Sequence, residues 1–197
     1  MTGFSKRRRE TAIRIQAAAI RLAQRDGMAH LTTEAISREA GVSPRTFFNY
    51  YPYKEAAIAG PPRDYPRDAS ETFMQGDGLL IDDLSRLLRA HLSRFTDQRD
   101  MIGALIRLAE TDGKLAALQQ SALLERHSQM EQMLRHRLSD RDPRLAPILA
   151  SAIISATRQA LLDWIAGATD DLVGQATENI GLIASLGELL DCQKPTP

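Results

Sequence analysis

The sequence has little of several residue types that mark particular protein classes. Cys192 is the single cysteine among 197 residues, so the chain cannot form an internal disulfide, and no Cys/His cluster has the spacing of a zinc site. The longest run without a charged residue, 145–157, is too short to cross a bilayer. The N-terminus lacks the apolar segment of a signal peptide. We therefore expect a cytoplasmic protein with no membrane partner, no metal and no cofactor.

The net charge of the whole chain is zero, but its two parts carry opposite charges. The chain carries 25 Lys and Arg residues and 25 Asp and Glu residues. Residues 1–60 hold ten bases and five acids, a local charge of +5, and the remaining residues carry −5. Backbone phosphates attract Lys and Arg regardless of base sequence. The charge pattern therefore favours a basic, nucleic-acid-binding domain at 1–60, followed by a domain at 61–197 with another task.

Strand patterns are nearly absent, and apolar residues recur with the 3.6-residue period of a helix from residue 9 to residue 190. The predicted fold class is all-α, with an N-terminal three-helix domain and a C-terminal helical domain. Helices are predicted at about 9–26 and 33–40, from residue 44 to before residue 52, from residue 81 onward, and at about 99–110, 113–139, 144–166 and 170–190. Residues 64–78 form either a mobile connection or a frayed helix.

Two short helices joined by a tight turn are predicted within residues 32–51. Thr32 is a good N-cap, Gly41 ends the helix that follows, and Ser43 caps the next helix, which has proline in its first turn. This is the arrangement of a helix-turn-helix, whose second helix enters the major groove of DNA. The expected packing set is Ala40, Val42, Phe47 and Tyr51, and the expected outward set is Arg45, Thr46, Phe48, Asn49 and Tyr50.

The run Leu31–Ala56, which reads LTTEAISREAGVSPRTFFNYYPYKEA, closely resembles the DNA-binding signature of the TetR/AcrR family of bacterial repressors. The resemblance implies a homodimer on a palindromic double-stranded DNA operator, with a C-terminal domain that binds a small inducer. It implies base contacts from Arg45, Thr46 and Asn49, and phosphate contacts from Thr33, Tyr50 and Lys54. The capping residue Ser43 and the outward Phe48 complete the set of DNA-binding candidates. The set is Thr33, Ser43, Arg45, Thr46, Phe48, Asn49, Tyr50 and Lys54.

The sequence departs from the family pattern at two places. Tyr51 stands where phenylalanine is more usual, which leaves the packing intact. Gly60-Pro61-Pro62 interrupts the helix that normally links the two domains, and so breaks the direct helical path for a ligand signal.

Several DNA-binding candidates also have a plainer structural interpretation. The run Lys6–Arg9 is either a solvated terminus or an arm that contacts phosphates or the minor groove. Arg45 is either an ordinary surface arginine or a residue that pairs with guanine. Phe48 and Tyr50 are either core aromatics or exposed groups that face DNA.

The last two predicted helices are the candidate dimer interface. Apolar residues surround the axis of the helix at 144–166, so we expect it to be buried on all sides. A partner chain would provide that cover, and four helices would form a bundle around a two-fold axis. A buried Arg158 would need Asp163, a partner-chain carboxylate or an anionic ligand beside it.

An apolar inducer pocket is predicted among the helices at about 81–166. Methionines and large apolar side chains would form its walls, and two polar side chains would orient the ligand. The candidates are Leu88, His91, Met101, Leu105, Met130, Leu134, Arg158 and Trp164. Plain core packing is the alternative for each apolar residue, and a buried core histidine is the alternative for His91. Scattered positions between Thr111 and Trp164 resemble a TetR subgroup with an acyl-CoA-like ligand, which implies a mostly apolar inducer.

The preferred function is a transcriptional repressor that leaves its operator when a small, mostly apolar inducer of acyl type binds. The alternative is an acyl-substrate carrier or enzyme in which the basic half is incidental. No Gly-rich phosphate loop, nucleophile elbow or Ser/His/Asp arrangement supports catalysis, so we expect no enzyme. His127 and Glu131 have the spacing of a metal pair, but two ligands without a third are typical of a surface pair.

Overall fold

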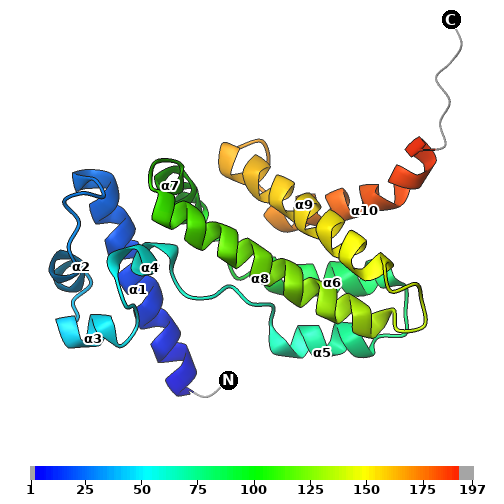
Figure 1. Cartoon of the computed structure of the whole chain (residues 1–197), viewed down its shortest axis with the longest axis horizontal. Helices are drawn as coiled ribbons and strands as arrows, with labels where there is room; N and C mark the ends of the chain where they lie inside the picture. The colour runs from blue at the N-terminus through cyan, green and yellow to red at the C-terminus, as the bar shows by residue number, and fades with distance from the viewer. Residues whose placement is uncertain (1–2, 191–197) are drawn as a thin grey trace, which may run out of the picture. The chain divides into compact units, whose positions relative to one another are not determined.

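The protein is built from α-helices, as a computed structural model that describes residues 3–190 shows (Figure 1). No strand occurs within that range, which confirms the predicted all-α class. The helices are α1 Gly3–Asp26, α2 Thr33–Glu39, α3 Pro44–Phe48, α4 Lys54–Ala59, α5 Arg67–Gln75, α6 Leu80–Leu92, α7 Arg99–Thr111, α8 Gly113–Arg137, α9 Leu145–Ala166 and α10 Leu172–Leu190. The lone cysteine, at position 192, lies outside the described residues.

The chain divides into two compact units. Unit 1 contains the chain up to Arg63 together with Asp100–Leu123, and unit 2 contains Asp64–Arg99 together with the chain from Leu124 onward. Unit 1 therefore includes residues 100–123, which the charge pattern assigns to the second domain. Most of α7 and the first part of α8 belong to unit 1.

The core of unit 1 is built around α1, an alanine-rich helix whose buried face packs against α2 and α4. Alanine has the highest helix propensity and lets neighbouring backbones approach closely. The helix ends before Gly27, which has a φ of +81° and donates its backbone N–H to the carbonyl oxygen of Ala23 at 3.0 Å. The largest buried members of this core include Ile15, Leu22, Ile36, Phe47, Ile58, Leu105 and Leu115.

The break expected at Gly60-Pro61-Pro62 is present at the end of α4. The helix α4 has six residues and ends at Gly60, which has a φ of +81°. At that end, the buried side-chain amide of Gln16 donates hydrogen bonds to the carbonyl oxygens of Ile58 (3.0 Å) and Ala59 (3.2 Å). These are carbonyls that a helix leaves without an internal partner at its C-terminus, so a side chain of α1 caps α4.

Unit 2 has its own core, in which α5, α6, the second part of α8, α9 and α10 take part. Its fully buried members include Phe73, Leu87, Leu88, Met130, Leu134 and Ile153. Residues 67–75 form a regular helix, so of the two alternatives for residues 64–78 the helix agrees with this stretch and the mobile connection is wrong. The reason is tertiary: Phe73 of α5 is 1% exposed and anchors the helix to this core. Leu124, at the start of the unit 2 part of α8, is 60% exposed.

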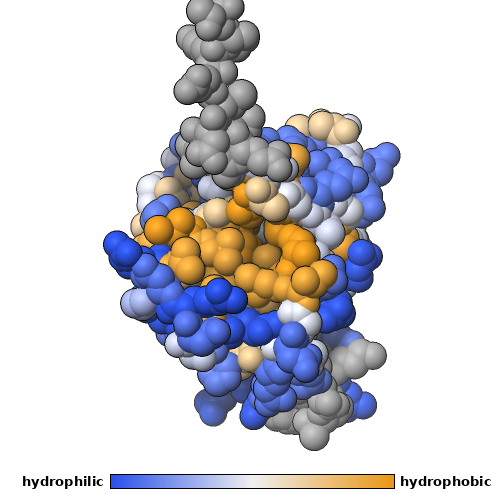
Figure 2. Space-filling view, turned by 90° about the vertical axis from the view of Figure 1, so that its right-hand side faces the viewer, coloured by the Kyte–Doolittle hydropathy of each residue, from blue (hydrophilic) through white to orange (hydrophobic). Residues whose placement is uncertain are grey.

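Two faces of α9 differ in burial, whereas the sequence predicts burial on all sides. Ala150, Ile153 and Ala160 are buried, while Ile148 on the opposite face is 66% exposed. By length and composition alone α9 could cross a membrane, but its buried face packs in the core of unit 2. The helix α10 packs beside it, and its side chain Leu182 is 62% exposed. Figure 2 shows a broad apolar surface, framed by hydrophilic side chains, on the side of the molecule where these helices lie.

Candidate nucleic-acid interface

The starts of α2 and α3 are fixed by local capping. The hydroxyl of Thr32 accepts a hydrogen bond from the Ala35 backbone N–H at 3.1 Å, and the hydroxyl of Ser43 accepts one from the Thr46 N–H at 3.0 Å. Between the helices, Gly41 has a φ of +64°, a left-handed conformation that favours glycine. The helices therefore begin where the capping residues predict. Ser43 holds α3 and also hydrogen-bonds the Thr46 hydroxyl at 2.8 Å.

The inner face of α3 anchors the helix to unit 1. Phe47 is fully buried, and Ala40 and Tyr51 are also buried, which confirms the predicted packing set apart from the half-buried Val42. The hydroxyl of Tyr51 donates a hydrogen bond to the carbonyl oxygen of Ala12 on α1 at 3.1 Å. Burial raises the pKa of this phenol well above its ordinary value, and the neighbouring Tyr50 adds to the shift. Tyrosine in place of phenylalanine thus adds a polar link between α3 and α1.

The outer face of α3 presents the predicted recognition side chains to solvent. Arg45 and Asn49 are exposed, and Thr46 is half-buried. Phe48 is 54% exposed, so its interpretation as a core aromatic is wrong. These side chains offer guanidinium and amide donors, hydroxyl groups and an apolar ring, which are the groups that read base edges and thymine methyls in a major groove.

Tyr50 lies at the edge of this surface, beside the basic start of α1. It is half-buried against the unit 1 core, so its two interpretations both hold in part. The guanidinium of Arg8 lies over its ring, 5.8 Å from the centroid. Arg7 and Arg8 are exposed on the first turns of α1, whereas the side chain of Lys6 lies outside the described residues. The basic run is thus part of a helix next to α3.

Lys54 has internal partners that the sequence does not reveal. Its ammonium donates hydrogen bonds to the carbonyl oxygens of Met28 (2.8 Å) and Leu31 (3.0 Å), in the turn between α1 and α2. These partners lie 26 and 23 residues away in the chain. Lys54 therefore ties α4 to that turn, and a phosphate contact from its remaining N–H stays a prediction. Thr33, the other phosphate candidate on α2, is half-buried and donates to the Glu34 carboxylate at 3.2 Å.

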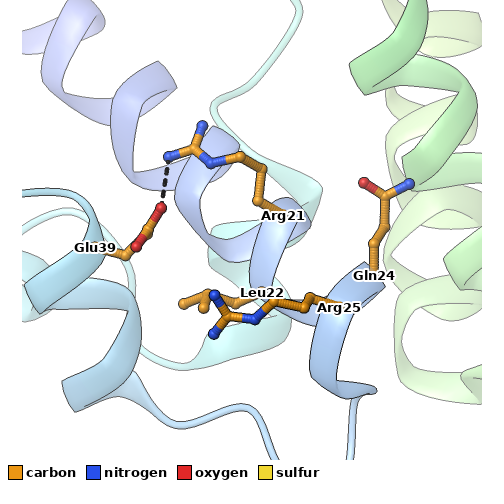
Figure 3. A pocket seen from close by; sticks show the side chains of 5 residues that line it. All are labelled: Arg21, Leu22, Gln24, Arg25 and Glu39. Atoms are coloured by element: carbon orange, nitrogen blue, oxygen red, sulfur yellow. Dashed lines mark hydrogen bonds and ion pairs between the residues drawn. The ribbon is translucent and has the colours of Figure 1, made fainter.

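An open hollow of about 490 Å³ lies beside α1 and α2, and no predicted DNA-binding residue lines it (Figure 3). Its lining residues are Arg21, Leu22, Gln24, Arg25 and Glu39. Arg21 reaches across to Glu39 at 3.2 Å, and Arg25 pairs with Asp26 at 2.8 Å. Because both guanidinium groups have a carboxylate partner, this hollow offers little attraction to a second anion.

Four of the predicted ligand-contact residues come together in unit 2. Leu88, Met130 and Leu134 are fully buried side chains of one core. His91 is also buried, and its ring centroid lies 4.5 Å from that of the tilted Tyr65 ring and 5.4 Å from that of the Phe95 ring, which it meets edge-on. The packing agrees with the plainer interpretation of these residues as core side chains.

The other four candidates lie elsewhere. Met101 and Leu105 pack in the core of unit 1. Trp164 is buried near the end of α9, where the Arg99 guanidinium lies 5.5 Å from its ring centroid. Arg158 is exposed in the single chain, and of the three partners considered for it, Asp163 is not in contact with it. The neighbouring Gln159, rather than Arg158, donates a hydrogen bond to Asp163, at 2.8 Å.

Arg126 is a side chain near the unit 2 cluster that the candidate set omits. It is half-buried on α8, and no carboxylate pairs with it among residues 7–186. Burial lowers the pKa of Arg126, while the nearby Tyr65 opposes that shift. Burial also raises the pKa of Tyr65 to about 12. The spacing of Arg126 from Met130 and Leu134, at i, i+4 and i+8, is the sequence signal that could have placed it on the same stripe.

A second hollow, of about 140 Å³, lies between α5 and α6, and none of the eight ligand candidates lines it. Its lining residues are Ala69, Thr72, Phe73, Asp83, Arg86 and Leu87. The buried carboxylate of Asp83 is neutralised by Arg86 and by Arg137, the latter at 3.1 Å. This network is a structural ion-pair cluster.

The histidine and glutamate with metal-pair spacing form a surface contact. His127 Nδ1 lies 3.9 Å from the Glu131 carboxylate, and His127 Nε2 lies 2.9 Å from the Ser151 hydroxyl. Within the described part of the chain, no group of three His, Cys, Asp or Glu side chains is arranged to hold a metal ion.

Comparison with known proteins places the α1–α4 region in a known family. Residues 15–58 match the family described as bacterial regulatory proteins, tetR family. That stretch contains α2 and α3 entire, and the recognition surface lies within it. No curated protein sequence matches the chain.

Solved structures extend the likeness to nearly the whole chain. The TetR-family repressor FadR of Thermus thermophilus, solved in complex with lauroyl-CoA, has 22% sequence identity and a TM-score of 0.55, covering 94% of this chain and 98% of FadR. The fatty acid degradation regulator FadR of Bacillus halodurans has 15% identity and a TM-score of 0.57, covering 88% of this chain and 94% of that regulator. At these identities the likeness shows a shared fold.

Proposed function

We propose that the chain is a cytoplasmic repressor of the TetR family that a small ligand releases from its operator, because residues 15–58 match the family of bacterial regulatory proteins. The observation that carries the proposal is the outer face of α3. Arg45 and Asn49 are exposed there with no structural task of their own, beside the half-buried Thr46. A helix that exposes polar side chains on one face and is held by a buried side chain, here Phe47, on the other face is suited to the major groove.

The operator is a palindrome read by a homodimer. A single α3 contacts only a few base pairs, so a second copy related by two-fold symmetry is needed for a specific site. The apolar surface of α9 and α10, with Ile148 and Leu182 mostly exposed, supports a dimer through these helices. Large exposed apolar surfaces on a folded chain mark sites of association.

The ligand is mostly apolar and of acyl type. This part of the proposal is supported by the fold shared with the Thermus thermophilus repressor, which was solved with lauroyl-CoA. The site that we propose is the unit 2 cluster of Leu88, His91, Met130 and Leu134, with Arg126 at its edge. Methionine side chains adapt to apolar guests, and the half-buried guanidinium is suited to an acidic or phosphate end group. Because these residues are tightly packed, the ligand must open the core in order to enter.

A ligand that opens this core shifts the protein between two conformations. Release from DNA requires that the ligand bind one conformation more tightly than the conformation that fits the operator. A difference of about 2.8 kcal/mol corresponds to a hundredfold loss of operator affinity.

Selection of DNA fragments from a random pool, followed by gel shift on the selected fragment, tests the DNA-binding part. We expect an inverted-repeat sequence that binds two chains, and scrambling one half should remove most of the affinity. Binding that is equally tight to every fragment and that weakens only with salt would instead fit an acyl carrier or enzyme with an incidental basic half.

Titration of the protein–operator complex with lauroyl-CoA tests the ligand part. Trp164 is the only tryptophan and is 3% exposed, so its fluorescence reports on rearrangement within unit 2. We expect the emission change and the loss of operator binding over the same concentration range, with no effect from coenzyme A alone. A ligand that leaves both signals unchanged at saturating concentration contradicts the acyl assignment and leaves the DNA-binding assignment intact.

A further inference from the structure

The helices α9 and α10 contain one basic residue in their whole length, Arg158. It lies in the middle of α9 and is exposed. No carboxylate of the described part of the chain lies within ion-pair distance of it. An exposed arginine is ordinary on a polar surface, but this one lies on a helix whose outer face carries Ile148 and Leu162. A charge on an apolar surface that becomes covered needs a partner.

Nearly all of the described acidic side chains of α9, α10 and the loop between them have a hydrogen-bond or ion-pair partner. Asp163 accepts a hydrogen bond from Gln159 at 2.8 Å, and Asp170 pairs with Arg99 at 3.0 Å. Asp171 caps α10 by accepting a hydrogen bond from the Gly174 backbone N–H at 2.9 Å. Among the acidic side chains that the structure describes in this region, the remaining one is Glu178. It is exposed and has no hydrogen-bond or ion-pair partner within residues 7–186.

Glu178 lies in the centre of the outer face of α10. It is one turn from Gly174, Gly181 and Leu182, all on that face at i±3 or i±4 spacing. Gly181 has open space around its Cβ position, so another helix can approach closely there. A carboxylate at the centre of such a face would be buried by any helix that packs on it.

Arg158 and Glu178 lie at a similar height along the pair of helices α9 and α10. The Asn179 side chain donates a hydrogen bond to the Ala156 carbonyl oxygen at 3.1 Å, which fixes the register of α10 against α9. Glu178 is one residue from Asn179, and Arg158 is two residues from Ala156. The two residues are therefore near one level of the α9–α10 pair but lie on outer faces, where each is available to a second chain.

We propose that Arg158 pairs with Glu178 of a second copy of this chain, and that the two crossed ion pairs set the register and partner choice of the dimer. The proposal rests on the homodimer of the proposed function. In a two-fold interface, a contact from residue 158 to residue 178 is repeated from 178 to 158, so one complementary pair of side chains yields two bonds. The apolar surroundings supply affinity, while the charges reject helices that slide by a turn or belong to another protein.

Charge exchange tests the pairing directly. In a homodimer of Arg158→Glu both crossed pairs become Glu–Glu, and in one of Glu178→Arg both become Arg–Arg, so each variant should raise the dimer dissociation constant roughly tenfold or more. An equimolar mixture of the two variants makes both crossed pairs attractive again. We expect that mixture to form a one-to-one heterodimer, and the double variant Arg158→Glu/Glu178→Arg to recover the homodimer.

Native mass spectrometry distinguishes the species by mass, and sedimentation equilibrium gives the dissociation constants. Arg89→Glu is the matched control, because Arg89 is an exposed arginine on α6, and it should dimerise like the parent chain. Homodimers of unchanged affinity for both single variants would overturn the proposal. So would a mixture and a double variant that both stay monomeric, since the charges would then act on folding. A parent chain that is monomeric while it binds a single half-site contradicts the dimer itself, which is the separate failure of the proposed function.

Discussion

Gln16 on α1 donates a hydrogen bond from its side-chain amide to the carbonyl oxygen of Ile58 on α4 at 3.0 Å, across 42 residues of sequence. The amide is buried and lies against Gly60, where the chain turns away from the helix. One polar side chain thus satisfies the end of α4 and occupies the space that a side chain at position 60 would need. The same contact holds α4 against the helix that starts the DNA-binding region.

Gly60→Ala should destabilise unit 1 by about 1–3 kcal/mol. The residue has a φ of +81°, and a Cβ there would overlap the Gln16 side chain, so the substitution adds backbone strain and breaks the cap. Chemical denaturation followed by circular dichroism measures the loss. Gly113→Ala is the control, because a Cβ at Gly113 meets nothing within 4 Å at the start of α8. Equal stability of the two variants contradicts the assigned role of Gln16.

Lys54→Met should lower both stability and DNA affinity. The substitution keeps most of the apolar stem but removes the hydrogen bonds to the Met28 and Leu31 carbonyls, at a cost of about 1–3 kcal/mol. Because the turn before α2 loosens, every operator sequence should bind more weakly by a similar factor. Thermal unfolding and a panel of operator variants measure the two effects. Lys114→Met removes an exposed pair with Glu55 and should change stability by less than about 1 kcal/mol.

Arg45→Ala should relax the base preference at one position in each half-site, with a cost of roughly 1–3 kcal/mol on the preferred operator. Arg45 is exposed and is held by no described ion pair, so the folded state should keep its stability. Repeating the random-pool selection with the variant measures the preference. Arg89→Ala removes an exposed arginine far along the chain, on α6, and should leave the selected sequence unchanged. An Arg45 variant that selects the parent operator assigns the side chain to solvent or to a phosphate.

Unit 1 should lose stability as the pH rises above about 10. Burial holds the pKa of Tyr51 above its ordinary value, so near and above pH 10 the unfolded chain releases the phenolic proton while the folded chain keeps it. Stability is therefore full below the unfolded pKa and falls as the pH rises past it. Tyr51→Phe should flatten this pH dependence in urea denaturation between pH 8 and 11. The variant should also lose about 0.5–1.5 kcal/mol near pH 8 from the missing bond to Ala12.

The starts of α2 and α3 were predictable because the chemistry that sets them is local, whereas α3 ends at Phe48, earlier than the predicted end before residue 52. The hydroxyls of Thr32 and Ser43 bond backbone groups three residues away, so the signal lies within one turn of sequence. The same reasoning separated Phe47 from Phe48, since adjacent residues on a short helix point to different faces. Local chemistry did not reveal that Lys54 is held by two carbonyls, because those groups lie more than 20 residues away.

The ligand candidates were less predictable because periodicity identifies the buried face of a helix but not the core that the face joins. Leu105 and Met130 both lie on apolar stripes, yet they belong to different units. Arg158 illustrates the same limit. The apolar residues around α9 indicated burial on all sides, while the single chain leaves one face of that helix, with Arg158, exposed. Periodicity alone does not reveal whether such a face is covered within one chain or by a second chain.

The residues that hold α3 in place differ from those on its outer face, and this separation bears on how operator preference can change in evolution. Ser43, Phe47 and Tyr51 hold the helix through a cap, a buried ring and a hydroxyl, and none of these contacts involves Arg45 or Asn49. Under the proposed function, substitutions at positions 45 and 49 should therefore have small effects on folding and large effects on the DNA sequence that is read. Descendants of one ancestral gene can drift to new operators one base at a time, without passing through an unfolded intermediate.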